Sequence, residues 1–341
     1  MGHAARCIPI IRYLISEGHK VSVAADEEAL ELLKNTFESQ IDAYSFSQTK
    51  IKYGKRKFST QLRLIKDAFS YFNYYKKEKN NCLSLLNKIG NVDLIISDNR
   101  YACYSNTIPS IIISHQIRLK LPALLQVFSF IPNHFILKRI KRFNELWIPD
   151  IEDEKTNLSG KLSHPKPQKI NVKYIGILSR FAKTTSQIKE KQITVILSGP
   201  EPQKSIFEEH ILSELKNLSQ YSIILIGGKK VWEKKNIKSI KLKNSMEIES
   251  YLTEAETVIS RAGYTSIMDY IKTQKRAIMI PTPGQTEQEY LAKHLTGFPQ
   301  FVFQKQNKIN IKLGLEKLEK GKGMFQTMGN SFVKEIEKHL I

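Results

Sequence analysis

Short apolar runs alternate with amphipathic stretches along most of the chain. The apolar runs end at polar or glycine residues, which is typical of strands that are buried on both faces of a parallel sheet. The stretches between them repeat apolar residues at helical spacing. Strands that alternate with helices predict parallel sheets with crossover helices on both faces, so the expected fold class is α/β.

The pattern predicts eight strands and seven helices. The strands are expected at Lys20–Ala25, Val92–Ser97, Ser110–Ser114, Glu145–Ile148, Ile193–Ser198, Tyr221–Ile226, Val258–Ser260 and Arg276–Ile280. The helices are expected at Ala4–Ser16, Glu27–Lys34, Ser205–Leu218, Glu247–Thr253, Thr265–Thr273, Gln288–His294 and Phe325–His339.

The order of the elements predicts two domains. The polar segment Asp150–Pro167 contains a glycine and two prolines, so it is expected to be a loop region, and a second cycle of strands begins at Ile193. We expect a Rossmann-like, doubly wound domain over residues 1–175, a second one over 176–324, and a helix within 325–341 that packs back on the first domain. A ligand between two such domains would touch the carboxyl ends of both sheets, so the domains are expected to face a common cleft.

Positive charge is concentrated in two segments. The 53 Lys and Arg residues outnumber the 33 Asp and Glu residues by 20, and 15 of these excess charges lie in Lys50–Lys88 and Gln116–Arg142. Such a field attracts the phosphates of nucleic acid or of an anionic bilayer. The alternative is a lysine-rich composition without a functional role.

Both basic segments also carry large apolar side chains. Aromatic residues are frequent in Phe69–Tyr75, just ahead of Lys76, and an interrupted apolar run, Leu119–Leu137, leads into Lys138. This run is too broken for a transmembrane helix, which needs about 20 mainly apolar residues, but it suits a helix lying in a membrane interface. The alternative is that both segments form core faces of helices whose lysines are solvated.

The three cysteines are scattered and form no metal-ligand spacing. They are Cys7, Cys82 and Cys103. This usage favours a reducing compartment. We therefore expect a cytoplasmic protein. The apolar groups beside lysines add the expectation that it could be peripheral on the inner face of the membrane.

The segment Val258–Ala292 carries the clearest chemistry. An apolar strand ends at Ser260, a glycine turn follows at Gly263, and a helix begins with Thr265. This arrangement directs backbone N–H groups and the positive end of a helix dipole at one point, which suits a phosphate. Arg261 adds a positive charge beside that point.

Groups suited to a ribose and a sugar follow in the same unit. Asp269 lies about one turn into the helix, within reach of a ribose diol. The loop after the next strand carries Gln285, Glu287 and Gln288, which are neutral and acidic groups of the kind that hydrogen-bond sugar hydroxyls. Together these features predict a nucleotide-sugar site, and an ordinary βαβ unit with a glycine cap is the alternative.

This segment resembles the donor-binding signature of GT-B glycosyltransferases, and most closely the MurG-like branch that includes lipid-linked and diacylglycerol glycosyltransferases. The resemblance implies that Asp269 binds the ribose of a UDP-sugar and that Glu287 and Gln288 bind its sugar. Relatives often carry glutamate in place of Asp269, so the shorter side chain departs from the family pattern.

The resemblance extends over most of the chain, because Gly2-His3 and Ser198-Gly199 also match. It implies that the turn at Ser198 and Gly199 places N–H groups on the diphosphate. Arg180 resembles a family arginine near the phosphates. Arg180 and Arg261 are therefore expected to stabilise the leaving group, which elsewhere is the task of a metal ion. No Asp-x-Asp motif is present, so no metal site is expected.

Met1, Gly2 and His3 lead directly into the first predicted helix, with no strand ahead of it. In the family this glycine–histidine turn follows the first strand of the N-terminal sheet, and that strand is central in Rossmann-like order. Loss of a central strand would leave buried N–H and C=O groups unpaired. We therefore expect that the first strand is missing through truncation and that the coding sequence upstream of Met1 encodes it in frame.

Glycosyl transfer needs a base for the acceptor hydroxyl. His3 can take that proton, a contribution of ~10²–10⁴-fold for a well-placed histidine. In the resembling family the histidine of this turn faces the acceptor side of the cleft. His115, which follows a predicted strand, is a second candidate for the base. Asp98 follows another strand and could orient either histidine or bind the acceptor.

The resemblance implies an inverting, metal-independent glycosyltransferase that moves a sugar from a UDP-sugar to an acceptor hydroxyl. The acceptor is unidentified and could be lipid-linked at the cytoplasmic membrane face. The UDP-sugar is a substrate, and no cofactor is expected. Two alternatives remain: a UDP-sugar 2-epimerase of the same fold, and a basic protein that binds nucleic acid through its N-terminal half. Nucleic acid ranks last as a partner because the sequence shows no nucleic-acid-binding motif.

Overall fold

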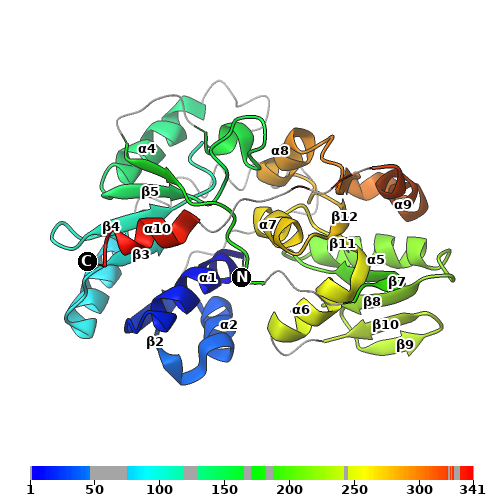
Figure 1. The fold of residues 1–341 in the computed structure, drawn as a ribbon, viewed down its shortest axis with the longest axis horizontal. Helices are drawn as coiled ribbons and strands as arrows, with labels where there is room; N and C mark the ends of the chain where they lie inside the picture. Colours follow the sequence, from blue (N-terminus) through cyan, green and yellow to red (C-terminus); the bar gives the residue numbers. More distant parts are fainter. Residues whose placement is uncertain are drawn as a thin grey trace. The chain divides into compact units, whose positions relative to one another are not determined.

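The computed structural model describes residues 2–46, 75–118, 129–164, 170–181, 187–241, 245–321, 323, 325 and 331–340. These residues form two compact units (Figure 1). Unit 1 contains the described residues up to Arg180 and those from 331 onward, and unit 2 contains the described residues from Phe181 to 325. The division falls a few residues beyond the predicted one. Parallel sheets in both units confirm the predicted α/β class.

Unit 1 contains two parallel sheets. The first pairs β1 (Val21–Ala25) with β2 (Ile41–Ser45), and the second has the order β3 (Ile95–Asp98), β4 (Ser110–Ile113), β5 (Glu145–Ile148) and β6 (Val172–Tyr174). The helices are α1 (Gly2–Ser16), α2 (Glu27–Phe37), a helix over 75–89, α4 (Phe130–Ile140) and α10 (Ser331–Glu337), with short 3-10 turns η1 (Glu38–Gln40) and η3 (Gly160–Leu162).

The local sequence explains the elements that carry the N-terminal part of unit 1. Helix α1 repeats small and branched apolar residues at helical spacing, and it buries Ala4, Ile8 and Ile11 in the core that it shares with β1, α2 and β2. Helix α2 begins where the Asp26 side chain accepts a hydrogen bond from the backbone N–H of Ala29, at 3.1 Å. This cap satisfies one of the N–H groups that a helix start leaves without a helical partner.

The two sheets of unit 1 are separate. Among the described residues, β1 pairs only with β2, and β3 pairs with β4 but has no partner on its other side. One edge of β1 and one edge of β3 are therefore without a strand partner in the part of the chain that the structure describes. The strand expected ahead of Gly2 stays a prediction.

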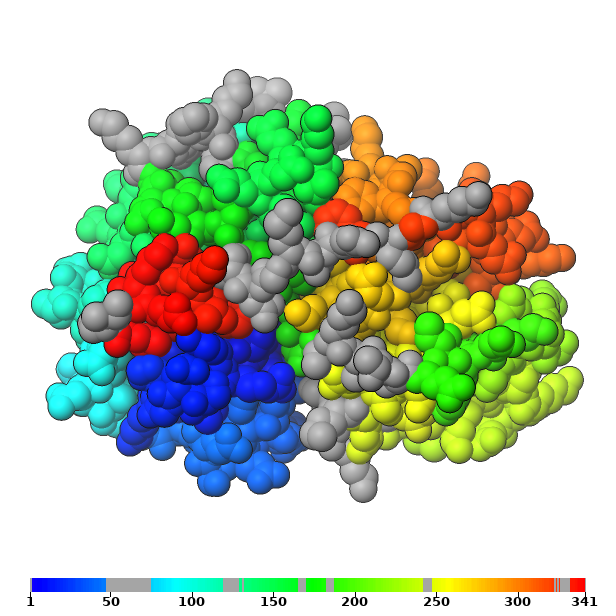
Figure 2. All heavy atoms as spheres, viewed as in Figure 1, coloured from blue at the N-terminus to red at the C-terminus, as the bar shows by residue number. Residues whose placement is uncertain are grey.

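The terminal helix α10 packs within unit 1. The ring of Phe332 meets the ring of Tyr13 edge-on with centroids 6.1 Å apart, and the Tyr13 hydroxyl donates to Glu337 at 3.1 Å. Figure 2 shows α10 in red against the blue atoms of α1. The helix is shorter than the predicted Phe325–His339, and most residues between 322 and 331 lie outside the described part.

Unit 2 is built on one seven-stranded sheet. Its order is β13 (Phe301–Phe303), β12 (Arg276–Met279), β11 (Ala255–Ser260), β7 (Lys189–Ile196), β8 (Ser222–Ile226), β10 (Ile237–Ile240) and β9 (Trp232–Lys234). All neighbours are parallel except β9 and β10. The helices are α5 (Gln203–Leu215), α6 (Ser245–Glu254), α7 (Tyr264–Lys272), α8 (Thr286–His294) and α9 (Ile311–Lys320), with a 3-10 turn η4 (Gln306–Lys308).

One core of unit 2 joins α5 and α9 to the sheet. Phe207, Ile211 and Leu215 of α5 are fully buried against residues such as Val195 of β7. Because β7 and β11 are central in the sheet, their apolar residues are covered on both faces. The buried centre of the sheet therefore fixes the positions of the strand ends and of the loops that follow them.

Parts of the two predicted basic segments lie outside the described residues. Of the aromatic run Phe69–Tyr75, only Tyr75 is within the described residues, and positions 119–128 of the apolar run Leu119–Leu137 also lie outside them. In the part of the chain that is described, every helix is too short or too polar to cross a bilayer.

Candidate active site

Most of the predicted donor-binding residues follow neighbouring strands of unit 2. The strands β12, β11, β7 and β8 are adjacent and parallel, so their carboxyl ends lie at the same edge of the sheet. Ser198 and Gly199 follow β7, Arg261 and Gly263 follow β11, and Gln285 follows β12. We call this edge, with the loops that follow the four strands, the donor edge. Ligands of open α/β sheets bind outside the carboxyl ends of the strands.

The turns after β7 and β8 lie close together. Ser198 and Gly199 are exposed, and Gly199 has a φ of 104° that favours glycine. After β8, Gly227 has a φ of 81°, and a Cβ there would lie 2.7 Å from the carbonyl oxygen of Leu197. Only a glycine allows the two turns to approach so closely. This second turn was not among the predicted site features, although the Gly-Gly pair at the end of a predicted strand is a signal for it.

Helix α7 begins at the donor edge with Gly263 as its N-cap. Gly263 has an ordinary φ of −79°, and a Cβ there would meet only the Ser266 hydroxyl, at 3.8 Å. The fold itself therefore does not require glycine at this position. The Tyr270 hydroxyl donates to Ser260 Oγ at 2.8 Å and ties the helix to the end of β11. Thr265 is half-buried in the first turn, where the helix dipole is positive.

Arg261 points into unit 2. Its side chain is 2% exposed, and its guanidinium donates to the carbonyl of Gln203 at 2.7 Å and to that of Ile280 at 3.4 Å. The guanidinium also lies over the ring of Phe207, 4.1 Å from its centroid. Burial lowers the pKa of Arg261 to about 10. These contacts connect α5 to the strand ends, and the predicted contact with a phosphate stays a prediction.

Two further residues that are predicted to bind the sugar donor, Asp269 and Arg180, do not belong to the loops that follow the strands. Asp269 is 3% exposed in the middle of α7, and its main-chain oxygen accepts hydrogen bonds from both the backbone N–H and the hydroxyl of Thr273. Its predicted contact with a ribose stays a prediction. Arg180 is half-buried and belongs to unit 1, next to its boundary with unit 2 in the sequence.

The loop after β12 is held by Gln288, one of the residues that are predicted to bind the sugar. The Gln288 side chain is 8% exposed, and its amide oxygen accepts a hydrogen bond from the backbone N–H of Thr282 at 2.8 Å. The Gln285 backbone N–H donates to the carbonyl of Thr282 at 3.1 Å. Gln285 and Glu287 are half-buried at the start of α8. Gln288 therefore holds the loop, whereas Gln285 and Glu287 are the more accessible of the three.

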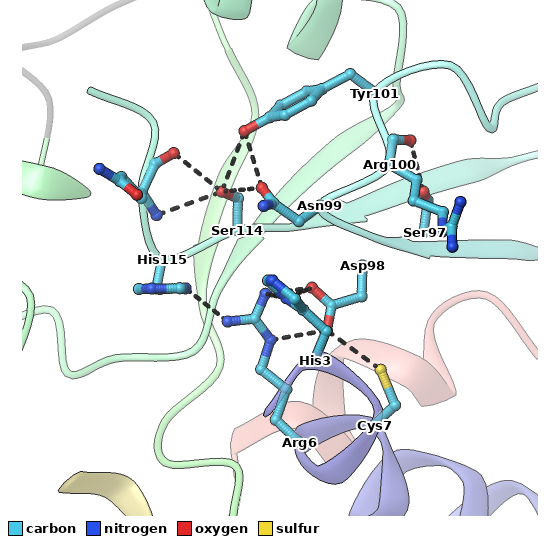
Figure 3. Close-up of polar contacts among 11 residues, drawn as sticks. His3, Arg6, Cys7, Ser97, Asp98, Asn99, Arg100, Tyr101, Ser114 and His115 are labelled. Carbon is cyan, nitrogen blue, oxygen red and sulfur yellow. Dashed lines mark hydrogen bonds and ion pairs between the residues drawn. The ribbon is translucent and has the colours of Figure 1, made fainter. Parts of the chain in front are cut away.

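In unit 1 a cluster of polar side chains joins the start of α1 to the ends of β3 and β4 (Figure 3). Nδ1 of His3 lies 3.2 Å from Oδ1 of Asp98. Arg6 makes a fork to the same carboxylate: Nε donates to Oδ2 at 2.8 Å, and Nη2 donates to Oδ1. The Arg6 side chain is 1% exposed, whereas that of His3 is 47% exposed. The three predicted catalytic residues His3, Asp98 and His115 all belong to this cluster.

His115 is buried behind Arg6. Its Nδ1 lies 2.5 Å from Nη1 of Arg6, and the residue is 7% exposed. A guanidinium can only donate hydrogen bonds, so Nδ1 of His115 accepts, and the proton of the neutral ring is on Nε2. This arrangement makes His115 a support for Arg6 and leaves His3 as the accessible histidine.

The cluster keeps Asp98 ionised. Burial alone would raise the pKa of Asp98, but the Arg6 guanidinium and the His3 ring beside it hold that pKa well below its usual range. The Cys7 thiol donates to Oδ2 at 3.4 Å, and burial together with the negative charge of Asp98 raises the pKa of Cys7. A carboxylate that stays ionised can orient a neighbouring imidazole and stabilise its protonated form.

The loops that carry the cluster are fastened to one another. Asn99 has a φ of 55°, and its side-chain oxygen accepts hydrogen bonds from the Tyr101 hydroxyl at 3.0 Å and the Ser114 hydroxyl at 3.2 Å (Figure 3). Arg100 forms an ion pair with Glu78 of the helix over 75–89, at 3.0 Å. These bonds set the positions at which Asp98 and His115 leave their strands.

Comparison with known proteins identifies the class of enzyme. Residues 194–338, from β7 through α10, match the family model described as the glycosyltransferase family 28 C-terminal domain. The chain is a glycosyltransferase. No curated protein sequence matches it significantly.

Solved structures share the fold of this glycosyltransferase. The spinosyn rhamnosyltransferase SpnG, complexed with thymidine diphosphate, is similar with a TM-score of 0.65 at 10% identity, over 99% of this chain and 97% of that one. UGT2 of Phytolacca americana, complexed with UDP-2-fluoro-glucose and pterostilbene, has a TM-score of 0.61 at 13% identity, over 100% and 96%. MurG of Acinetobacter baumannii has a TM-score of 0.50 at 15% identity, over 94% and 87%. The predicted GT-B fold is confirmed.

The family match covers one of the two groups of residues in the glycosyltransferase. The donor edge lies within 194–338, whereas the cluster around His3 lies outside it. Sequence reasoning also missed Arg6 in that cluster. The available signal was the spacing of His3, Arg6 and Cys7, which puts three polar residues on one face of a mainly apolar helix.

Proposed function

We propose that this glycosyltransferase transfers a sugar from a UDP-sugar to an acceptor hydroxyl, with inversion at the anomeric carbon and without a metal ion. The pairing of His3 with Asp98 carries the proposal. The ring of His3 is accessible, and its Nδ1 faces a carboxylate that stays ionised. Within the part of the chain that the structure describes, Nε2 of His3 has no hydrogen-bond partner. A ring oriented in this way can accept a proton at Nε2.

The proposed reaction is a single displacement. The acceptor hydroxyl transfers its proton to Nε2 of His3 while its oxygen forms a bond to the anomeric carbon. The bond between that carbon and the diphosphate oxygen breaks, and the nucleoside diphosphate leaves with the bonding electrons. Attack from the face opposite the leaving group inverts the configuration. Asp98 stabilises the imidazolium that forms.

The donor edge suits a nucleoside diphosphate sugar. Gly263 caps α7 without a side chain, and the dipole of α7 favours an anion at that end. In the proposal Ser198, Gly199 and the first turn of α7 bind the diphosphate, and Gln285 and Glu287 bind the sugar. Thymidine diphosphate is bound in the SpnG complex and a UDP-sugar in the UGT2 complex. These complexes support a pyrimidine nucleotide, and uridine rests on the family resemblance.

The leaving group needs positive charge, which we assign to the N-terminus of α7 and to Arg180. The sequence has no Asp-x-Asp motif, which supports a reaction without a metal ion. Asp269 is assigned to the ribose. Because its side chain is 3% exposed, this assignment needs a small rearrangement of α7 when the donor binds.

The exposed surface of α4 supports an acceptor at a membrane. Phe130 is 65% exposed and Phe135 is 37% exposed, and the exposed cations Lys138, Lys141 and Arg142 follow them. Aromatic groups beside lysines suit the interface of an anionic bilayer. We therefore propose a lipid-linked acceptor, a cytoplasmic location and peripheral association with the inner membrane face.

Nucleotide binding to the full chain tests the donor assignment. Thermal unfolding is measured with UDP, TDP, other nucleoside diphosphates and UDP-sugars. A ligand at about 100 times its dissociation constant adds ~2.7 kcal/mol to the free energy of unfolding, which raises the melting temperature by several degrees. We expect the largest shift for uridine nucleotides. A folded protein that responds to no nucleoside diphosphate would contradict the proposal, and conversion of a UDP-sugar without any acceptor would favour an epimerase.

A further inference from the structure

One nitrogen of His3 has two competing partners. Its Nδ1 lies 2.9 Å from Nη2 of Arg6 and 3.2 Å from Oδ1 of Asp98. The guanidinium can only donate a hydrogen bond, and the ionised carboxylate can only accept one. A single ring nitrogen cannot accept from Arg6 and donate to Asp98 at the same time. Each contact therefore corresponds to a different tautomer of the neutral imidazole.

The two tautomers differ in what they can do. When Nδ1 carries the proton and donates to Asp98, Nε2 has a lone pair and can take a proton from a hydroxyl group. When Nδ1 accepts from Arg6, the proton is on Nε2, and that nitrogen cannot act as a base. Whether Nδ1 accepts from Arg6 or donates to Asp98 therefore decides whether Nε2 of His3 can take the proton of the acceptor hydroxyl.

The guanidinium of Arg6 is firmly held. It is 1% exposed, it binds both oxygens of Asp98, and Nη1 donates to Nδ1 of His115. Because its partners come from the ends of two different strands, Arg6 cannot rotate away from His3 without breaking those bonds (Figure 3). Arg6 also stays protonated at every physiological pH. It is therefore a permanent donor beside Nδ1.

We propose that Arg6 is a positioning residue that sets the tautomer of His3. The shorter of the two contacts is the one to Arg6, so the free protein holds His3 mainly as the Nε2-protonated form. An acceptor hydroxyl that donates to Nε2 then selects the other form, in which Nδ1 donates to Asp98. This inference rests on the proposed function in one respect, namely that His3 is the base, and the experiment below needs no substrate.

The tautomer is measured by NMR on the full chain labelled with ¹⁵N-histidine, at alkaline pH. The His3 signals are assigned by their loss in His3→Gln. We compare the wild-type protein with Arg6→Met, which has no donor, and Arg6→Lys, which keeps the charge but lacks the fork. Arg12→Gln is the matched control, because Arg12 is an exposed arginine of the same helix.

The expected result is a wild-type signal dominated by the Nε2-protonated form. In Arg6→Met the ratio of Nδ1-protonated to Nε2-protonated ring should rise about tenfold, which corresponds to the loss of one charge-assisted hydrogen bond. In Arg6→Lys the ratio should rise in the same direction, because a single ammonium lacks the fork that binds Asp98, His115 and His3 together. Arg12→Gln should leave the ratio unchanged. An unchanged ratio in a folded Arg6 variant would overturn the inference, as would a wild-type ring protonated mainly on Nδ1.

The design separates this inference from the proposed function. Arg6→Met leaves Asp98 buried without its cation, and if this variant fails to fold, Arg6→Lys decides the question. If the tautomer responds as expected but no sugar is transferred to any acceptor, the proposed function fails while the inference about Arg6 holds. If transfer occurs and the tautomer does not respond, Arg6 only supports the fold.

Discussion

Nδ1 of His3 lies 3.2 Å from Oδ1 of Asp98, although 95 residues separate them in the sequence. One residue belongs to the first turn of α1 and the other ends β3. The pair is held because Arg6 fixes the carboxylate from within α1, and because the loop after β3 is bonded to the loop after β4. An accessible imidazole paired with a buried, ionised carboxylate is the feature from which the catalytic predictions follow.

Replacing either member of the pair should slow transfer. In His3→Gln the base is lost, and kcat should fall by ~10²–10⁴-fold. In Asp98→Asn the imidazolium loses its stabilising charge, and kcat should fall in the same direction. The assay is steady-state transfer, with nucleotide affinity measured separately, which should stay near the wild-type value. His19→Gln, a histidine outside the cluster, is the control and should keep full activity. Wild-type kcat in His3→Gln would rule out His3 as the base.

Adding one methyl group at Gly263 should weaken nucleotide binding without harming the fold. The Cβ of Gly263→Ala would meet only Ser266 Oγ, at 3.8 Å, so the free energy of unfolding should change by less than about 1 kcal/mol. The methyl group would occupy space through which a phosphate approaches the helix, so affinity for the nucleoside diphosphate should fall about tenfold or more.

Gly314→Ala should have the opposite effects on stability and nucleotide affinity to those of Gly263→Ala. A Cβ at Gly314 would lie 2.6 Å from Cδ1 of Ile278, so this variant should lose stability and keep its nucleotide affinity. Calorimetry of unfolding and of nucleotide binding measures both quantities. If Gly263→Ala binds the nucleotide as tightly as the wild type, the start of α7 is not the phosphate site.

Removing the exposed aromatic residues of α4 should reduce membrane binding. In the double variant Phe130→Ser and Phe135→Ser, the partition coefficient onto vesicles containing anionic lipid should fall about tenfold or more, because two apolar side chains no longer enter the interface. Cosedimentation with vesicles measures the partition coefficient, which should also fall as salt concentration rises. Val231→Ser removes a side chain of unit 2 that is 68% exposed and should have no effect. Equal binding by both variants would argue against α4 as the membrane surface.

Lys275 should give the stability of the protein a distinct pH dependence. The side chain is 4% exposed, it donates to the carbonyls of Thr253 and Ala255, and burial lowers the pKa of Lys275 to about 8. An unfolded lysine has a pKa of about 10.4, so between these values the unfolded chain binds more protons than the folded one. The contribution of Lys275 to the free energy of unfolding therefore rises as pH increases from about 8 to about 10.4.

Urea denaturation at several pH values in this window tests the role of Lys275. The slope of the free energy of unfolding against pH should be smaller in Lys275→Met than in the wild-type protein. Lys216→Met, which removes an exposed lysine, should keep the wild-type slope. If the slopes of wild type and Lys275→Met are equal, Lys275 does not titrate in this window.

The continuously buried strands were predictable, whereas five short strands at or next to a sheet edge were not. β4 and β5 occur where they were predicted because every residue of β4, and all but the first of β5, is buried, and each strand is apolar after its first residue. The predictions omitted β2, β6, β9, β10 and β13. In β10 Ile237 and Ser239 are buried while Lys238 is exposed. Because lysines are frequent around this strand, the alternation of buried and exposed residues is not evident in the sequence. A short strand at or next to a sheet edge is stabilised by pairing with its neighbouring strand. The local sequence pattern carries no information about that neighbour.

The sequence by itself determined the α/β class and the donor edge. Gly263, Thr265 and the residues of the following loop belong to one βαβ unit, and their relation is set by local spacing. Only the tertiary structure decided that Arg6 meets His3, Asp98 and His115, and that Arg261 and Gln288 point inward to hold loops. Contacts between residues far apart in the chain depend on how helices and strands pack, and packing decides which polar groups are enclosed and therefore must find partners.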